Sequence, residues 1–221
     1  MAKTRIEWLN GGFSINPVKG LCPMACKDLK DKEYCYARRL YRRFKWNPEI
    51  RFDINAMLSP MLIQKPSRIF IGSTIELFGE WIDEEWLSSI LYMVEKTPRH
   101  TFIFLTKRPE NLHLWKFPPN AWVGVSATNQ AMATNAIHYL KDIKATVKFI
   151  SFEPLLEPVN VPLCGISWVL IGARTQPLRL PDKNWVYLIT HTAENFGAKV
   201  FLKNNLQSLY PGIKLRQEWP K

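Results

Sequence analysis

The chain has 221 residues, of which 47% are hydrophobic and 22% charged, a composition typical of a soluble globular protein with a sizeable core. Lys and Arg outnumber Asp and Glu by 30 to 19, and the resulting net charge of +11 favours a polyanionic partner, nucleic acid above all. The sequence lacks a secretory signal and any apolar run long enough to span a bilayer, so we expect a cytoplasmic protein without a membrane partner.

The sequence predicts one domain. It contains no Gly/Ser-rich linker, low-complexity block or clear internal repeat that would divide it. The prolines at 118 and 119 lie between strand-like runs, as they would in an ordinary loop. We therefore expect a single domain over residues 1–221.

The first predicted element is a short strand over residues 12–16, and a segment with three of the four cysteines follows it. Cys22 and Cys26 lie in Cys-Pro-Met-Ala-Cys, and Cys35 lies in Tyr-Cys-Tyr-Ala. Thiolates are ligands of iron–sulfur clusters and structural zinc, and in a reducing compartment clustered cysteines are more often ligands than disulfides. The segment therefore predicts a metal site in a loop at residues 20–36.

A basic helix is predicted directly after the cysteines, over residues 36–44. Its arginines alternate with apolar and aromatic residues, which gives one apolar and one strongly basic face. Cys35 would lie at the start of this helix, where backbone amides and the helix dipole favour a thiolate. A nucleic-acid backbone could lie on the basic face, although a merely solvated face is the alternative. The predicted nucleic-acid contacts are Arg38, Arg39, Arg42 and Arg43.

Strands and helices alternate through the rest of the chain. Most of the strand-like runs are continuously apolar, as in parallel strands buried on both faces. The further predicted strands are 68–72, 101–106, 122–126, 147–151, 168–172 and 199–202. This alternation favours an α/β fold with a parallel sheet, either open or curled into a barrel.

Three amphipathic helices are expected between these strands. The first follows Asp83, which can cap it, and the second runs from about Gln130 to Asp142. The third ends at Gly197. The apolar face of the first comprises Trp86, Leu87, Ile90, Leu91 and Val94, and that of the third Trp185, Leu188, Ile189, Thr192 and Phe196.

Polar residues follow several of the predicted strands. In parallel sheets, function gathers at the carboxyl ends of the strands, although loops are also polar simply because they are solvated. The repetition of the pattern is better evidence than any one residue. These residues are Ser73, Thr74, Glu76, Thr106, Lys107, Arg108, Ser126, Asn129, Ser151, Glu153 and Arg174.

The cysteine segment resembles the signature of the radical S-adenosylmethionine superfamily, C-x3-C-x2-C with an aromatic residue before the third cysteine. Here Tyr34 is that aromatic residue, and eight residues separate the second and third cysteines where two are usual. A loop of this length can still bring Cys35 to the same cluster, because the entropy of loop closure rises slowly with length.

Other segments resemble a phage-associated family of uncharacterised radical-SAM-like proteins. They are Ile6–Trp8, Asn16–Gly20, Leu105–Glu110, Val123–Ser126 and Ser151–Leu156. That family is similar to the spore photoproduct lyase group, whose members pair a cluster in the loop after the first strand with a partial (β/α)6 TIM-like barrel. The resemblance therefore implies a partial barrel of parallel strands with outer helices.

The resemblance also implies an activity. Cys22, Cys26 and Cys35 would hold a [4Fe-4S] cluster whose open iron binds S-adenosylmethionine. One electron from a reductant such as flavodoxin or ferredoxin would release a 5′-deoxyadenosyl radical, for modification or repair of a nucleic acid. By position, Ser73 or Glu76 would receive the methionyl ammonium, Lys107 or Arg108 the carboxylate, and Ser126 or Asn129 the ribose hydroxyls. Tyr34 and Glu153 complete the expected cofactor contacts, and Glu153 and Cys164 are the candidate catalytic residues.

Several alternatives stay open from the residues alone. Glu153 could form a salt bridge with a strand-end Arg or Lys. The three cysteines and a fourth ligand could hold structural zinc in a nucleic-acid-binding protein without catalysis, or a degenerate barrel could act only as a binding protein. Cys164 could donate a hydrogen atom or ligate the metal, but a small buried residue is the favoured interpretation. The four histidines form no H-E-x-x-H motif, which argues against hydrolytic zinc catalysis.

Overall fold

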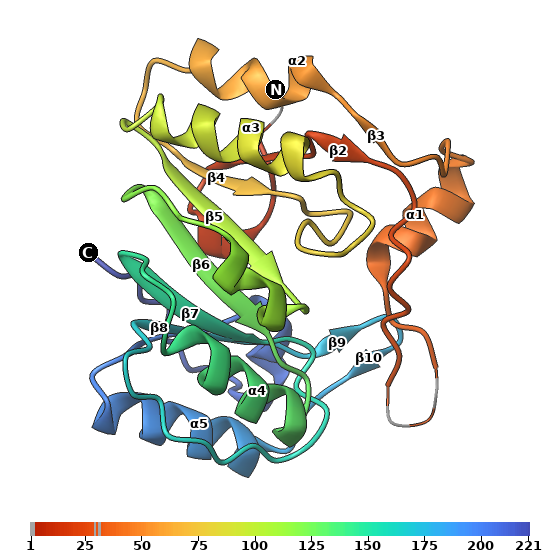
Figure 1. Cartoon of the computed structure of the whole chain (residues 1–221). Coiled ribbons are helices and arrows are strands. Elements are labelled where there is room, and N and C mark those ends of the chain that lie inside the picture. Colours follow the sequence, from red (N-terminus) through yellow and green to blue (C-terminus); the bar gives the residue numbers. More distant parts are fainter. Residues whose placement is uncertain (1–2, 29, 31) are drawn as a thin grey trace. The chain divides into compact units, whose positions relative to one another are not determined.

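Parallel strands alternate with helices in the computed structural model, which describes residues 3–28, 30 and 32–221 (Figure 1). Seven strands form one sheet in the order β1-β4-β5-β6-β7-β8-β11. Their bounds are Phe13–Ile15 (β1), Arg68–Ile71 (β4), Thr101–Thr106 (β5), Ala121–Ser126 (β6), Val147–Phe152 (β7), Trp168–Ile171 (β8) and Lys199–Leu202 (β11). The predicted strands and the parallel α/β class are confirmed.

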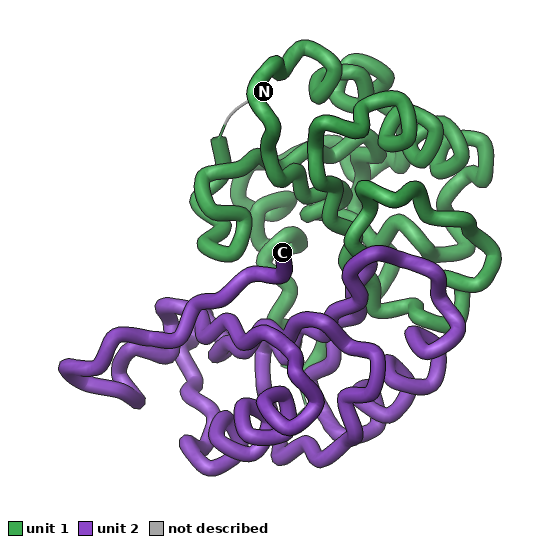
Figure 2. The backbone as a smooth tube through the Cα atoms, turned by 90° about the vertical axis from the view of Figure 1, so that its left-hand side faces the viewer, with its two compact units in different colours: residues 1–122 green, residues 123–221 purple. Residues whose placement is uncertain are grey.

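The chain divides into two compact units, Met1–Trp122 and Val123–Lys221 (Figure 2). The division falls within β6. That the whole chain forms a single domain stays a prediction.

Unit 1 contains the parallel pairs β1 with β4 and β4 with β5. Its helices are α1 (Tyr36–Phe44), α2 (Ile54–Leu58) and α3 (Glu84–Glu95). Helix α3 begins as predicted, because the Asp83 side chain accepts a hydrogen bond from the N–H of Glu85 at 2.8 Å. Its predicted apolar face is buried except for Trp86, which is half-buried and stacks on Phe52.

The sequence pattern did not predict the shorter elements. Strand β2 (Val18–Lys19) pairs with β3 (Arg51–Phe52), and β9 (Arg174–Thr175) pairs with β10 (Leu178–Arg179), both antiparallel. Two-residue strands give no periodicity, and helix α2 is too short to show an apolar stripe. The 3-10 turns are η1 (Glu7–Leu9), η2 (Ser59–Leu62), η3 (Pro109–Leu114) and η4 (Asn204–Leu209).

His100 is buried directly before β5, and its Nε2 lies 3.1 Å from the carbonyl oxygen of Pro60. Burial lowers the pKa of His100 below its usual 6.5. As the pH falls below 6.5, the unfolded chain therefore binds more protons at this residue than the native protein does. We expect the free energy of unfolding to decrease as the pH falls from 6.5 through the lowered pKa, and to be insensitive to this group above 6.5.

Urea denaturation across this acidic range would measure the effect. His100→Asn is expected to flatten the decrease, because it removes the titrating group. The exposed His113 provides the control, and His113→Asn should leave the slope unchanged. Equal slopes for wild type and His100→Asn would refute the assignment.

Unit 2 contains the parallel pairs β7 with β8 and β8 with β11. Helix α4 (Gln130–Leu140) packs on β7, and α5 (Lys183–Asn195) packs on β8 and β11 (Figure 1). Gly124 in β6 leaves room for an aromatic neighbour, because a Cβ atom there would lie 2.3 Å from the Phe149 ring. The core of this unit is therefore built from close strand contacts and large rings.

The predicted buried face of α5 is wrong. Its buried residues are Val186, Ile189 and Ala193, whereas Leu188 and Phe196 are exposed. The predicted and the actual face share Ile189 but are rotated relative to one another around the helix. The sheet selects the face with the smaller side chains, because a compact face allows the helix to approach the strands closely.

None of the helices in the described part of the chain combines the length and apolarity that a membrane crossing demands.

Candidate metal centre

Hydrogen bonds join the carboxyl ends of neighbouring strands in unit 1. Asn16, directly after β1, accepts hydrogen bonds through Oδ1 from the Ser73 hydroxyl at 3.2 Å and the Thr74 N–H at 3.1 Å. Both partners lie in the loop after β4. Tyr36, the first residue of α1, donates its hydroxyl to the carbonyl of Ser73. This loop is therefore held against both β1 and the basic helix.

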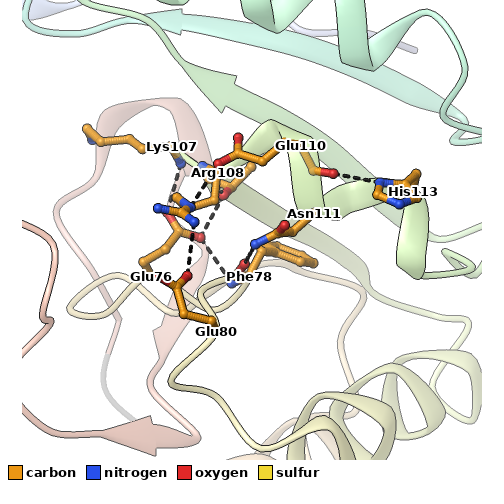
Figure 3. Close-up of polar contacts among 9 residues, drawn as sticks. Glu76, Phe78, Glu80, Lys107, Arg108, Glu110, Asn111 and His113 are labelled. Carbon is orange, nitrogen blue, oxygen red and sulfur yellow. Dashed lines mark hydrogen bonds and ion pairs between the residues drawn. The ribbon is translucent and has the colours of Figure 1, made fainter.

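Glu76 ties the same loop to the end of β5 (Figure 3). This buried carboxylate accepts hydrogen bonds through Oε1 from the Phe78 N–H at 3.0 Å and the Thr106 hydroxyl at 2.6 Å. Its Oε2 accepts one from the N–H of Lys107 at 2.7 Å. A carboxylate is costly to bury without partners, so these three bonds explain why it can lie here.

Arg108 belongs to a second set of contacts around this loop. Its guanidinium lies 3.0 Å from Glu80 and 2.9 Å from Glu110 (Figure 3). Asn111 donates a hydrogen bond to the carbonyl of Phe78 at 2.7 Å. The predicted cofactor contact Arg108 is thus engaged in two ion pairs that hold the loop.

Helix α1 holds the beginning of the cysteine loop. The N–H of Gly20 donates to the hydroxyl of the buried Tyr41 at 2.8 Å, and Nη2 of Arg38 donates to the carbonyl of Cys22 at 2.7 Å. Across the loop, the N–H of Tyr34 donates to the carbonyl of Cys26 at 3.0 Å. These bonds bring the two halves of the cysteine motif together despite the longer spacing.

The three predicted thiols interact with one another. A side-chain hydrogen bond from Cys26 lowers the pKa of Cys35 to about 6 and raises the pKa of Cys26. The N–H groups of Ala37 and Arg38 also lower the pKa of Cys35, as its place before α1 predicted. Burial raises the pKa of Cys22, and the negative charge of the nearby Cys35 thiolate raises it further.

Cys22 is linked to Glu76 as well. The backbone N–H of Glu76 forms a hydrogen bond with the Cys22 sulfur that favours its thiolate and opposes part of the effect of burial. The loop after β4 therefore contributes both a carboxylate and a backbone donor to the surroundings of the thiols.

Lys107 is a half-buried cation beside the same group. Burial lowers the pKa of its ammonium, but the nearby Cys26, Tyr34, Glu76 and Cys35 more than offset this and raise the pKa above its usual value. The predicted cofactor contacts Tyr34, Glu76 and Lys107 and the three predicted metal ligands thus form one cluster in unit 1.

Within residues 3–28, 30 and 32–221, no three His, Cys, Asp or Glu side chains are arranged to hold one ion. Structural zinc and a cubane cluster both take thiolates as ligands, so the zinc and the iron–sulfur interpretations of the three cysteines both stay predictions.

The remaining predicted cofactor contacts lie in unit 2. Ser126 is buried at the end of β6, and Asn129 caps α4 by accepting a hydrogen bond from the Met132 N–H at 2.8 Å. Glu153, after β7, forms an ion pair with Lys203, which follows β11. The salt bridge considered as the alternative for Glu153 is therefore present, and the cofactor roles of these residues stay predictions.

The prediction that Cys164 is buried is wrong, because this residue is exposed. It lies with Gly165 in a turn that is closed by a hydrogen bond from the Ile166 N–H to the Leu163 carbonyl at 3.1 Å. The buried Leu163 and Ile166 fill the core on either side. The turn needs two residues outside the core, and Cys164 is one of them.

The four predicted nucleic-acid arginines have different surroundings. Arg38 is directed to the cysteine loop by its bond to Cys22, and Arg39 is half-buried. Arg42 is exposed and lies 2.8 Å from Glu33. Arg43 is exposed, with its guanidinium over the Phe44 ring at 5.3 Å. Arg42 and Arg43 are therefore the two that face solvent.

Sequence reasoning assigned no role to Asn16, Tyr41 or Glu33. Asn16 directly follows β1, just as the other polar candidates follow their strands. Its place at a strand end could therefore have identified it as a candidate site residue. Tyr41 lies on the apolar face of α1, where an aromatic residue is expected only to pack. Its hydroxyl bond to the cysteine loop depends on a fold contact that no pattern encodes.

Glu76→Gln is expected to destabilise unit 1 by about 1–3 kcal/mol, because the amide NH₂ would face a donor where the carboxylate now accepts hydrogen bonds. Urea denaturation measures this change. Glu80→Gln is the control, since Glu80 is exposed and its loss should cost less than about 0.5 kcal/mol. A Glu76→Gln protein as stable as Glu80→Gln would contradict the structural role of the three bonds.

No curated protein and no solved structure matches the chain. A family described as "Protein of unknown function (DUF5131)" matches residues 3–208, a range that includes all seven strands of the sheet and the cysteine loop. The chain therefore belongs to the DUF5131 family.

Proposed function

We propose that this protein is a radical S-adenosylmethionine enzyme in which Cys22, Cys26 and Cys35 hold a [4Fe-4S] cluster, and that its substrate is a nucleic acid. The observation that carries the proposal is the grouping of three interacting thiols with Lys107 and Glu76 at the carboxyl ends of β4 and β5. When bound, such a cluster with S-adenosylmethionine supplies a 5′-deoxyadenosyl radical.

The residues around the thiols have distinct tasks in this proposal. Lys107 offsets the negative charge of the thiolates and offers its ammonium to the cofactor carboxylate. Glu76, fixed by three donors, offers the remaining acceptor capacity of its carboxylate to the methionyl ammonium. Arg108 is less suited to the cofactor carboxylate, because Glu80 and Glu110 already engage it.

The finer details of the fold belong to the same proposal. The cysteine loop follows β1, which supports a partial (β/α)6 barrel like that of the spore photoproduct lyase group. We assign the chain to the phage-associated radical-SAM-like proteins that its motifs resemble. The proposed setting is the cytoplasm, where flavodoxin or ferredoxin provides the electron.

The nucleic-acid part of the proposal rests on charge. Residues 1–51 contain 12 Lys and Arg against 5 Asp and Glu, so the basic excess lies in the segment that carries the cysteines. Arg42 and Arg43 are exposed on the helix that begins beside Cys35. A polyanion drawn to this helix would come close to the proposed reaction site.

Anaerobic reconstitution with iron and sulfide tests the proposal. We expect a brown protein that binds about four irons per chain, as the cubane requires. After chemical reduction it should produce 5′-deoxyadenosine from S-adenosylmethionine. A folded, iron-replete protein that does not cleave the cofactor would refute the activity. Stoichiometric zinc without iron uptake, in samples purified with and without air, would favour a structural zinc site instead.

A further inference from the structure

An aromatic and basic surface extends from the end of α1 into the following turn. Residues 36–46 contain five Arg and Lys and no Asp or Glu. Phe44 and Trp46 are 52% and 45% exposed, unusually high for large aromatic side chains. We call Arg42, Arg43, Phe44, Lys45 and Trp46 the aromatic–basic surface. Large exposed apolar groups rimmed by charge are typical of interaction sites.

The two rings of this surface are held in place before any partner binds. Phe44 and Trp46 stack with centroids 5.5 Å apart and planes 20° apart. Trp46 also meets the buried Tyr41 edge to face at 5.3 Å, and the guanidinium of Arg43 lies over the Phe44 ring. These contacts reduce the entropy that the rings would lose on binding a flat ligand.

A hollow of about 190 Å³ adjoins the Trp46 ring. Its lining consists of Leu21, Arg38, Tyr41, Arg42, Trp46 and Pro48. The lining combines aromatic and apolar surface with two guanidinium groups. Such a combination suits a flat heteroaromatic ring that is attached to a phosphate.

We propose that the aromatic–basic surface binds single-stranded nucleic acid, with an unpaired base extending the stack of the Phe44 and Trp46 rings and phosphates beside Arg43 and Lys45. A duplex buries the faces of its bases in its own stack, so only an unpaired strand can use these rings. An acidic protein would satisfy the cations but not the two exposed rings. This inference deepens the proposed function. It rests on that function only where it takes the bound nucleic-acid strand to be the substrate of the enzyme.

Fluorescence anisotropy with a labelled oligothymidylate, and with the same strand annealed to oligodeoxyadenylate, tests the inference on the full chain. We expect the single strand to bind more tightly than the duplex. Phe44→Leu combined with Trp46→Leu keeps apolar side chains but removes the aromatic faces, and it should weaken single-strand binding by about tenfold or more. Circular dichroism checks that this variant stays folded.

Two control variants separate stacking from charge. Tyr187→Leu with Phe196→Leu removes two exposed aromatic side chains of unit 2 and should leave binding unchanged. Arg43→Gln with Lys45→Asn should reduce the salt dependence of log K, by about 0.7 for each phosphate that the variant no longer neutralises. Asn is chosen because residue 45 has φ of 50°, which Asn tolerates.

Tighter binding of the duplex, or unchanged binding by the Phe44→Leu/Trp46→Leu protein, would overturn the inference. Binding needs no reconstituted cluster, and cofactor cleavage is measured separately on the same protein. A protein that cleaves S-adenosylmethionine but binds no strand would therefore refute this surface while the cluster chemistry stands. A protein that binds the strand through its rings but never cleaves the cofactor would support the surface and refute the proposed activity.

Discussion

Cys26→Ala is expected to lose the reconstituted iron and with it all detectable 5′-deoxyadenosine formation. Cys26 interacts with both Cys22 and Cys35, so its removal takes away one of three mutually interacting thiols. With two thiolates left, a cubane would have too few protein ligands to be retained. Iron analysis and chromatographic assay of 5′-deoxyadenosine, on samples reconstituted in parallel, would measure the two losses.

Cys164→Ala is the matched control for this prediction. It removes the one cysteine outside the motif, which is exposed in a turn of unit 2. We expect wild-type iron content from this variant. Retention of both iron and activity by Cys26→Ala, or equal losses of iron in the two variants, would show that the three thiols do not hold the cluster.

Trp168→Ala should produce the largest loss of stability, about 3–5 kcal/mol, because it leaves a large cavity in the core of unit 2. Trp168 is fully buried in β8, with its ring 5.6 Å from that of Phe149 in β7 and 6.2 Å from that of Phe201 in β11. Its indole N–H also donates to the carbonyl of Glu218 at 2.8 Å. The substitution thus removes packing against both neighbouring strands and one hydrogen bond.

Urea denaturation would measure this loss as a lower midpoint, and Tyr187→Ala provides the comparison. Tyr187 is an aromatic residue of α5 that is 61% exposed, so its removal should change stability by less than about 0.5 kcal/mol. A similar midpoint for the two variants would mean that Trp168 does not support the core.

The sheet strands could be predicted because local pattern and tertiary role agree. Runs such as Thr101–Thr106 are continuously apolar, and burial on both faces in a parallel sheet explains that composition. The short pairs β2 with β3 and β9 with β10 could not be predicted in this way. Both pairs are antiparallel, and the two strands of the first pair lie far apart in the sequence. A strand of two residues is also too short to show a periodic pattern of apolar residues.

The cysteine site was also predictable only in part. The three cysteines were evident from the motif, and the start of α1 after Cys35 followed from the helical pattern. Other contacts join segments that are separated in the sequence. They are the hydrogen bonds of Tyr41 and Arg38 to the cysteine loop, and the bond from the Glu76 backbone to Cys22. No local pattern specifies such contacts, because they form only when the strands bring these loops to one edge.

The sequence by itself determined the parallel α/β class, the positions of the sheet strands and the three clustered thiols, since each depends on composition or spacing within a short segment. Only the tertiary structure decided which polar strand ends meet. It placed Glu76 and Lys107 beside the thiols, committed Arg108 to ion pairs with Glu80 and Glu110, and left Cys164 exposed. The physical reason is that a polar side chain takes its role from the charges and donors around it, and the folded chain sets those surroundings.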